Sequence, residues 1–303
     1  FEVAGERTVD DAHGRGRTLT LHRLAVPGEP VLALDVTLYE EQPFVALQSR
    51  LTNAAGTPLA VQAFHLVRTT PVASGDGWRF YRHGWQSWSP TLTLSTDEDD
   101  IPAFPPLVDP ETRPHEGHLV SELVSCLHHG PSAQTITAGF LTAADQLSQV
   151  WLDGDGGLTA TSYADGIELA PGDTLSSERG MIDITPDPLA ALARYGDALA
   201  REMGAVSWPD ITTGWCSWYY YFQRVSEDDI LANLERLAEL RDELPLEFVQ
   251  IDDGYQAGIG DWLTPNEKFP RGMSWLAERI HERGFKAGLW LAPFLAGARS
   301  RLF

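Results

Sequence analysis

Short runs of alternating apolar and polar residues dominate the first 185 residues of the chain. In residues 32–38, apolar side chains stand at every second position, which is the pattern of a strand with one buried face. Clusters of turn-forming residues, such as Asp153-Gly154-Asp155-Gly156-Gly157, separate the runs. Similar runs occupy residues 18–22, 45–51, 59–67, 136–141, 149–152, 158–161 and 181–184. Many short strands joined by polar turns predict an antiparallel β-sandwich over residues 1–185.

Two segments interrupt this rhythm. Residues 95–118 hold five prolines and an acidic run, and we expect a long loop there. Farther on, Asp187 can cap a helix that has Pro188 at its first position and ends at Gly204. We therefore expect residues 186–208 to form a linker helix between two domains. Its apolar face would carry Leu189, Leu192, Gly196, Leu199 and Met203.

Strand-like and helix-like segments alternate after residue 208. Residues 213–222, 246–251 and 287–292 predict strands. Ser226, with Asp229 three residues on, predicts the start of one helix, and Gly284 predicts the end of a second. Such alternation predicts a parallel sheet, and we interpret residues 209–303 as the first strands and helices of a (β/α)8 barrel. Because that barrel takes about 250 residues, we expect a chain that stops inside it.

Charge and composition narrow the classes of partner. The formal net charge is −21 and the isoelectric point about 4.7, so we expect neither a nucleic acid nor an anionic membrane as partner. The acidity suits a neutral ligand or serves solubility alone. Cys126 and Cys216 have no metal-type spacing and imply no disulfide framework. With neither a signal peptide nor a membrane-length apolar run, a cytoplasmic protein is expected, although the chain lacks an initiator Met.

The strongest candidate for chemistry is Asp252-Asp253-Gly254-Tyr255, directly after the strand predicted over residues 246–251. In barrels of this kind ligands lie at the carboxyl ends of strands. Two adjacent carboxylates there can accept hydrogen bonds from neighbouring sugar hydroxyls. The same residues are also typical of a plain turn. A metal site is less favoured, because no further carboxylate or histidine cluster stands nearby in the sequence.

Ten tryptophans are many for a chain of this length, and tryptophan is both a core residue and a plate on which sugars stack. The stretch 215–222 holds several aromatic residues, of which Trp218 is the candidate ligand contact. Trp290 stands in the third predicted strand, where a core position is the alternative. Asp261 and Trp262 lie in a loop that either covers a sugar site or packs on the surface.

Four segments follow one another along the last third of the chain: Gly214-Trp215-Cys216-Ser217-Trp218, Val249-Gln250-Ile251-Asp252-Asp253-Gly254-Tyr255, Gly260-Asp261-Trp262 with Lys268-Phe269-Pro270-Arg271-Gly272-Met273, and Gly288-Leu289-Trp290 with Pro293. In this order they resemble glycoside hydrolase family 36, the α-galactosidases and related raffinose-synthase-type galactosyltransferases. Tyr81-Arg82-His83-Gly84-Trp85-Gln86-Ser87-Trp88-Ser89 also resembles part of that family's N-terminal β-sandwich, more loosely.

The resemblance implies roles for individual residues. Asp252 and Asp253 match carboxylates that bind galactose hydroxyls, and Trp218 and Trp290 match tryptophans that shape the sugar pocket. It also implies a nucleophile and an acid/base on barrel strands four and six, so no catalytic residue is expected within this chain. Retaining chemistry of this type uses two carboxyl groups about 5 Å apart and no cofactor or metal. Two departures bear on the choice of substrate: Cys216 replaces the Asn of several members, and Leu291-Ala292-Pro293 replaces a frequent Glu-Pro-Glu.

Three hypotheses follow for function. The leading one is an α-galactosidase that hydrolyses terminal α-galactosyl residues of oligosaccharides, with a small α-galactoside as its partner. The second is an α-galactosyltransferase of the raffinose-synthase type. The third is a non-catalytic carbohydrate-binding module. All three hypotheses are compatible with a homo-oligomer.

Overall fold

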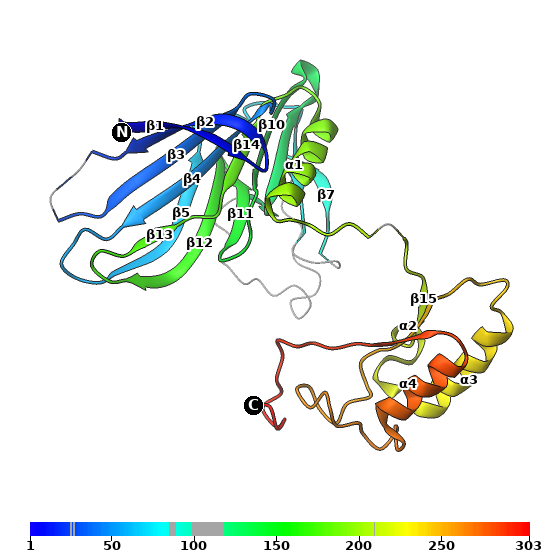
Figure 1. Ribbon diagram of the computed structural model, residues 1–303. Coiled ribbons are helices and arrows are strands. Elements are labelled where there is room, and N and C mark those ends of the chain that lie inside the picture. Colours follow the sequence, from blue (N-terminus) through cyan, green and yellow to red (C-terminus); the bar gives the residue numbers. More distant parts are fainter. Residues whose placement is uncertain (25, 27, 85–88, 99–117, 209) are drawn as a thin grey trace. The chain divides into compact units, whose positions relative to one another are not determined.

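The computed structural model describes the chain except residues 25, 27, 85–88, 99–117 and 209 (Figure 1). The chain divides into two compact units, Phe1–Val206 and Ser207–Phe303. Most of the loop predicted over residues 95–118 lies outside the described residues, as do residues 85–88 of the segment that resembles family 36. Among the helices of the described chain, none is long and apolar enough to cross a membrane.

Two antiparallel sheets form the first unit. The larger sheet has the order β1-β2-β3-β4-β14-β10-β9-β6-β7, with β13 paired to β4, and the smaller has the order β5-β12-β11-β8. The larger sheet contains β1 (Glu2–Asp11), β2 (Gly14–His22), β3 (Val31–Tyr39), β4 (Phe44–Thr52), β6 (Trp78–Arg82), β7 (Leu92–Ser95), β9 (Val124–His129), β10 (Gln134–Phe140), β13 (Thr174–Ser176) and β14 (Gly180–Asp183). The smaller contains β5 (Leu59–Arg68), β8 (Leu119–Glu122), β11 (Leu147–Leu152) and β12 (Leu158–Leu169), and a 3-10 turn spans Gly130–Ser132.

The two sheets of the first unit share one hydrophobic core. Phe80 and Phe140 of the larger sheet belong to the same buried cluster as Phe64 and Val150 of the smaller. Burying side chains of this size contributes about 1.5–3 kcal/mol each. The prediction of an antiparallel N-terminal β domain is confirmed. Strand β1 was not predicted, because nearly all of its residues are exposed and its sequence has no alternating pattern.

Helix α1 (Pro188–Glu202) packs on the larger sheet of the first unit, beside β10 in Figure 1. Asp187 caps it as predicted, accepting hydrogen bonds from the backbone of residues 189 and 190. The predicted apolar face was wrong in part. The helix buries Ala191, Tyr195 and Ala198, whereas Leu189 is 77% exposed. The structure thus assigns the helix of the expected 186–208 linker to the first unit.

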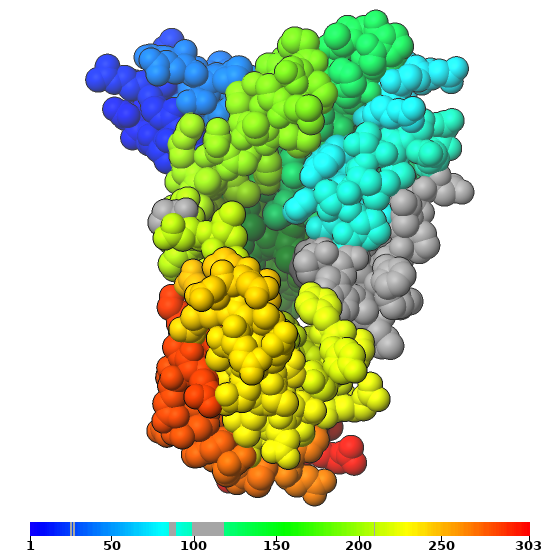
Figure 2. All heavy atoms as spheres, turned by 90° about the vertical axis from the view of Figure 1, so that its right-hand side faces the viewer, coloured from blue at the N-terminus to red at the C-terminus, as the bar shows by residue number. Residues whose placement is uncertain are grey.

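The second unit contains a three-stranded parallel sheet in the order β15-β16-β17. Its strands are β15 (Gly214–Cys216), β16 (Phe248–Ile251) and β17 (Lys286–Leu289), and its longer helices are α3 (Glu227–Glu239) and α4 (Gly272–Glu282). Figure 2 shows these helices side by side on the surface of the unit, α3 in yellow and α4 in orange. Ile230 and Leu234 of α3 and Leu276 and Ile280 of α4 are buried together with the strands.

The helix boundaries of the second unit follow the sequence closely. Ser226 and Asp229 form the predicted capping box, each side chain accepting from the other residue's backbone N–H. Gly284 adopts a positive φ of 78° just after α4, as predicted for its end. The strand predicted over residues 213–222 was wrong in its second half. The extended backbone covers only Gly214–Cys216, and the chain then turns into the short helices α2 (Trp218–Tyr221) and η2 (Phe222–Arg224).

Candidate functional site

The carboxyl ends of the three parallel strands are joined by hydrogen bonds. After β15, the backbone N–H of Ser217 donates to the carbonyl of Gln250 at 3.2 Å, and its hydroxyl accepts from the backbone N–H of Asp252 at 2.9 Å. After β17, the backbone N–H of Trp290 donates to the carbonyl of Ile251 at 2.9 Å. The segments that carry Trp218, Asp252 and Trp290 therefore begin at one edge of the sheet. Parallel sheets place ligands at this edge.

Asp252 is held by three donors of the protein and is only 8% exposed. Its Oδ2 accepts from the Gln250 amide at 2.8 Å and from the Cys216 thiol at 3.3 Å, and its Oδ1 accepts from the backbone N–H of Asp253 at 2.9 Å. Burial, followed by the hydrogen bond to Asp252 and its charge, raises the pKa of the Cys216 thiol, so the thiol stays protonated and keeps donating. None of these donors is a cation.

Asp253 is 7% exposed and sits between two amides. Gln223 donates to its Oδ2 at 2.7 Å, and Gln256 donates to its Oδ1. Lys268 interacts with the charge of Asp253 but makes no hydrogen bond to its carboxylate. The Lys268 ammonium donates instead to the backbone carbonyl of Gln223. Among the described residues, no ion pair within 4.0 Å joins Asp252 or Asp253 to a cation. A nearly buried carboxylate without a counter-ion keeps acceptor capacity for a ligand.

Two backbone features bring Gln223 to Asp253. Gly254 has φ +119°, and a Cβ there would lie 2.7 Å from both the Cα and the carbonyl oxygen of Gln223, so only glycine permits this approach. Phe222 adopts φ 50° and ψ −146°, a combination that is strained for any residue with a Cβ. Such strain costs about 1–3 kcal/mol and persists where surrounding contacts impose it, often at functional sites.

The tryptophans predicted from sequence lie in two aromatic pairs. Trp218, at the start of α2, makes an edge contact with Phe222 at a centroid distance of 5.2 Å. Trp290 makes an edge contact with Trp262 at 5.9 Å. This second pair joins the end of β17 to the loop after β16. In the sequence these two segments are separate candidates. Trp218, Trp262 and Trp290 are each half-buried, so part of each ring is exposed.

The other candidates lie around these groups. The Asp261 carboxylate accepts from the backbone N–H of Arg301 at 2.9 Å, which ties the loop to the segment after β17. Tyr255 is fully buried in the core of the second unit. Burial, and then the charge of Asp253, raises the pKa of Tyr255 to about 12.

The aromatic stretch 215–222 is divided between core and surface. Tyr219 and Tyr220 are 83% and 77% exposed, whereas Trp215 and Tyr221 pack against the core.

Sequence reasoning missed both amides that hold Asp253. Gln256 follows Asp253 by three residues, a spacing typical of a turn in which a side chain folds back. Gln223 stands thirty residues earlier, directly after the segment 213–222 that was expected to be strand. No pattern in the sequence pairs it with Asp253, because the contact depends on the unexpected turn after α2. Among the described residues, no group of three histidine, cysteine or acidic side chains is placed to hold a metal ion.

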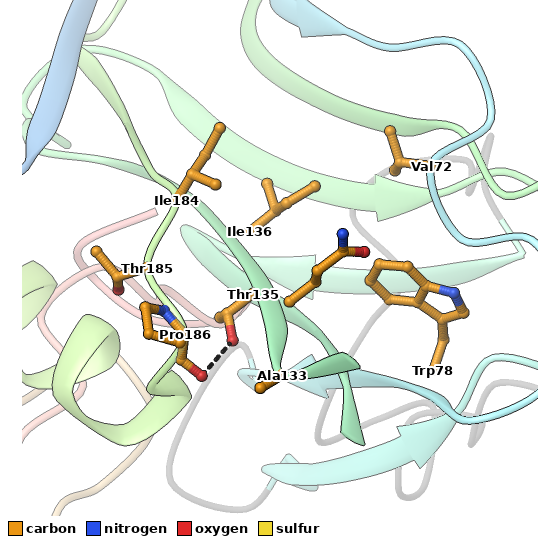
Figure 3. A pocket seen from close by; sticks show the side chains of 9 residues that line it. Val72, Trp78, Ala133, Thr135, Ile136, Ile184, Thr185 and Pro186 are labelled. Atoms are coloured by element: carbon orange, nitrogen blue, oxygen red, sulfur yellow. Dashed lines mark hydrogen bonds between the residues drawn. The ribbon is translucent and has the colours of Figure 1, made fainter. Parts of the chain in front are cut away.

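A separate cavity of about 430 Å³ lies within the first unit (Figure 3). Trp78, Ile136 and Ile184 line it, and the hydroxyl of Thr135 donates to the Pro186 carbonyl at 3.1 Å. No charged side chain is among its lining residues. The cavity therefore lacks the carboxylates that distinguish the site in the second unit.

Comparisons with known proteins lead to one family. Residues 205–303 match the family model described as Melibiase. Alpha-galactosidase 1 of Pediococcus pentosaceus is 26% identical over 172 residues, which is 52% of this chain and 22% of that protein. Alpha-galactosidase Mel36A of Lactobacillus acidophilus is 30% identical over 102 residues, which is 31% of this chain and 13% of that protein. The chain thus spans less than a quarter of the length of these curated relatives.

Solved structures extend the likeness over both units. TtGalA, an α-galactosidase from Thermus thermophilus in complex with p-nitrophenyl α-D-galactopyranoside, is 28% identical at a TM-score of 0.61, covering 93% of this chain and 51% of that one. The GH36 α-galactosidase AgaA from Geobacillus stearothermophilus has a TM-score of 0.67 at 16% identity, covering 99% and 45%, and shows the fold alone. On these grounds the chain is a region similar to the N-terminal part of the glycoside hydrolase family 36 α-galactosidases.

Proposed function

We propose that the chain is the front part of a retaining α-galactosidase that hydrolyses terminal α-galactosyl residues of oligosaccharides. The observation that carries the proposal is the Asp252–Asp253 pair. Two nearly buried carboxylates stand at the end of the central parallel strand and accept hydrogen bonds from neutral donors. Vicinal hydroxyls of a pyranose are suitable ligands for adjacent carboxylates of this kind. The similarity of this part of the chain to α-galactosidases supports galactose as the sugar.

In this proposal the second unit contributes the first strands of a (β/α)8 barrel. The β15-α3-β16-α4-β17 order and the parallel pairing support it. Asp252 and Asp253 bind sugar hydroxyls, while Trp218 and Trp290 bound the ring with their indoles. Asp261 and Trp262 belong to the loop that borders the site, and the contact between Trp262 and Trp290 supports that placement.

Retaining hydrolysis proceeds through a covalent glycosyl-enzyme and needs two further carboxyl groups about 5 Å apart. We assign neither of them to a residue of this chain. The role of the present residues is to bind and orient. Charge-assisted hydrogen bonds from the sugar to Asp252 and Asp253 would hold the anomeric carbon in a fixed position, which is the contribution that orientation makes to catalysis.

The direct test uses a polypeptide of the relatives' length that carries this region, with a chromogenic α-galactoside as substrate. We expect release of the chromophore and of galactose. A folded full-length protein that releases neither would contradict the proposal.

Transfer of galactose to a second sugar is the other candidate. Cys216 beside Asp252, where several members of the family have Asn, is the observation that keeps it open. Incubation with raffinose separates the two reactions, because hydrolysis yields free galactose and transfer yields a longer oligosaccharide.

A further inference from the structure

We propose that Gln223 is a positioning residue for Asp253, and that Lys268 and Gly254 hold it in that role. The inference rests on the proposed function in one respect only, the identity of the ligand. Its structural basis is the amide clamp, by which we mean Gln223 and Gln256 on either side of the Asp253 carboxylate. Gln223 does not need to touch the sugar to act, because it acts through Asp253.

Asp252 and Asp253 keep different numbers of lone-pair positions for a ligand. A carboxylate offers about four lone-pair positions. Asp253 uses one on each oxygen, for Gln223 and Gln256, so each oxygen keeps about one position for a ligand. Asp252 uses two on Oδ2 and one on Oδ1. Asp253 is therefore the residue that can accept from two hydroxyls at once, and the clamp sets the direction in which it does so.

Gln223 is an exposed residue, so its backbone needs support from other segments to keep one position. Three features supply that support. The ammonium of Lys268 donates to the backbone carbonyl of Gln223. The backbone of Gln223 rests on Gly254, where a Cβ would clash. The strained backbone of Phe222 turns the chain immediately before it. These features fix the backbone of Gln223 within reach of Asp253, and the hydrogen bond to the Asp253 carboxylate then orients the side-chain amide.

The clamp is neutral, and this property makes the proposal testable. The charged or titratable groups near Asp253, among the described residues, are Asp252, Tyr255 and Lys268. A Gln223→Glu variant replaces a donor by a carboxylate at the same distance. Two carboxylates 2.7 Å apart must share a proton to stay together, so the variant should titrate as a coupled pair. This signature shows that residue 223 contacts the Asp253 carboxylate, and the binding of galactose shows what that contact does for the ligand.

The first measurement is carbon-13 NMR titration of the aspartate carboxyls in the 303-residue chain, with the Asp253 signal assigned by Asp253→Asn. In Gln223→Glu we expect the Asp253 signal to titrate in two steps, with the upper step at a higher pH than in the unchanged chain. Gln62→Glu, the same change at an exposed position of β5, should leave the signal unchanged. An Asp253 titration that is identical in Gln223→Glu and the unchanged chain would overturn the proposal.

The second measurement is calorimetry with galactose at pH 7.5 and pH 5. Gln223→Met should weaken binding by about threefold to tenfold at both pH values, the effect of one lost hydrogen bond. Gln223→Glu should weaken binding more at pH 7.5 and recover toward the unchanged chain at pH 5, as the shared proton restores a donor. Lys268→Met should weaken binding less than Gln223→Met does.

The two measurements separate the two proposals. If the unchanged chain does not bind galactose, the proposed ligand is wrong, and the NMR titration still decides whether Gln223 and Asp253 are coupled. If galactose binds but Gln223→Met and Gln223→Glu bind it as well as the unchanged chain does, the positioning role is wrong and the proposed function stands.

Discussion

Two buried aspartates of the first unit and two of the second have different kinds of partner. In the first unit, Asp35 pairs with Arg50 at 2.7 Å and Asp183 pairs with Arg194 at 2.8 Å. In the second unit, Asp252 and Asp253 are similarly buried but meet amides, a thiol and backbone N–H groups. A carboxylate paired with arginine is neutralised in place and serves the fold, whereas one held by neutral donors retains its charge for a ligand.

A buried carboxylate paired with arginine also occurs within the second unit. Glu227, which is 2% exposed, pairs with Arg271 at 2.6 Å and links the start of α3 to the start of α4. Glu178 of the first unit departs from the pattern, since it accepts from Thr142 and from the backbone N–H groups of residues 145 and 146. Those donors belong to one local turn, so Glu178 closes a loop.

The largest expected effect comes from breaking the ion network of the first unit. Arg179 binds Glu202 at 2.8 Å and Asp11 at 3.1 Å, and its side chain is only 16% exposed. Arg179→Met leaves two carboxylates without their cation, and we expect it to lower the free energy of unfolding by about 3 kcal/mol. Chemical denaturation followed by circular dichroism measures this loss. A loss below about 1 kcal/mol would show that the network does not neutralise these groups.

The next effect concerns the backbone under the site. Gly254→Ala would place a Cβ 2.7 Å from the backbone of Gln223 at an unfavourable φ. We expect the second unit to lose about 2–3 kcal/mol of stability. Gly272→Ala is the matched control, because it has a positive φ of 77° but open space around it, and should cost about 1 kcal/mol. Equal losses in the two variants would mean that the approach of Gln223 is not tight.

The stability of the first unit should depend on pH through the same network of Arg179, Glu202 and Asp11. A hydrogen bond from His13, and then Arg179, hold the pKa of Glu202 below its ordinary 4.5. Burial alone would raise the pKa of Asp11, but hydrogen bonds from the His13 N–H, Tyr39 and Arg179 keep it below its ordinary 3.8. A lowered folded-state pKa gives stability that is present above the ordinary value and lost as the pH falls through the folded value.

Melting temperatures measured from pH 6 to pH 3 therefore test the network without denaturant. We expect the transition of the first unit to fall below about pH 4.5, and to fall less steeply in Arg179→Met. The same acid slope in both proteins would mean that Arg179 contributes nothing to the lowered pKa values of Glu202 and Asp11.

The smallest effect should come from an exposed ion pair. Arg236 and Glu239 on α3 are 2.7 Å apart, but their side chains are 66% and 65% exposed. Arg236→Ala should change the free energy of unfolding by no more than about 0.5 kcal/mol. A loss as large as that of Arg179→Met would mean that burial does not distinguish the two pairs.

Regular periodicity made much of the fold predictable. The caps at Asp187 and Ser226 and the stop at Gly284 could be read from sequence, because capping depends on residues close together in the chain. Exposed β1 and the turn after Ser217 could not. The first has no buried face to impose alternation, and the second depends on contacts with residues 250–254.

The candidate site was likewise predictable only where it depends on residues close together in the sequence. The position of Asp252 and Asp253 at a strand end was predictable from adjacent residues, whereas the partners of their carboxylates come from distant segments. Gln223 and Cys216 contact the pair from 30 and 36 residues earlier in the sequence. Hydrogen bonds of this kind follow from the packed structure and have no local pattern.

The most direct test of the central claim is calorimetry of the 303-residue chain with galactose. The unchanged chain should bind, and the double variant Asp252→Ala with Asp253→Ala should bind more than about 100-fold more weakly, since each carboxylate loses charge-assisted hydrogen bonds. Asp242→Ala, at an exposed position after α3, is the control and should bind as the unchanged chain does. Equal binding by the double variant and the unchanged chain would contradict the claim that this pair holds the sugar.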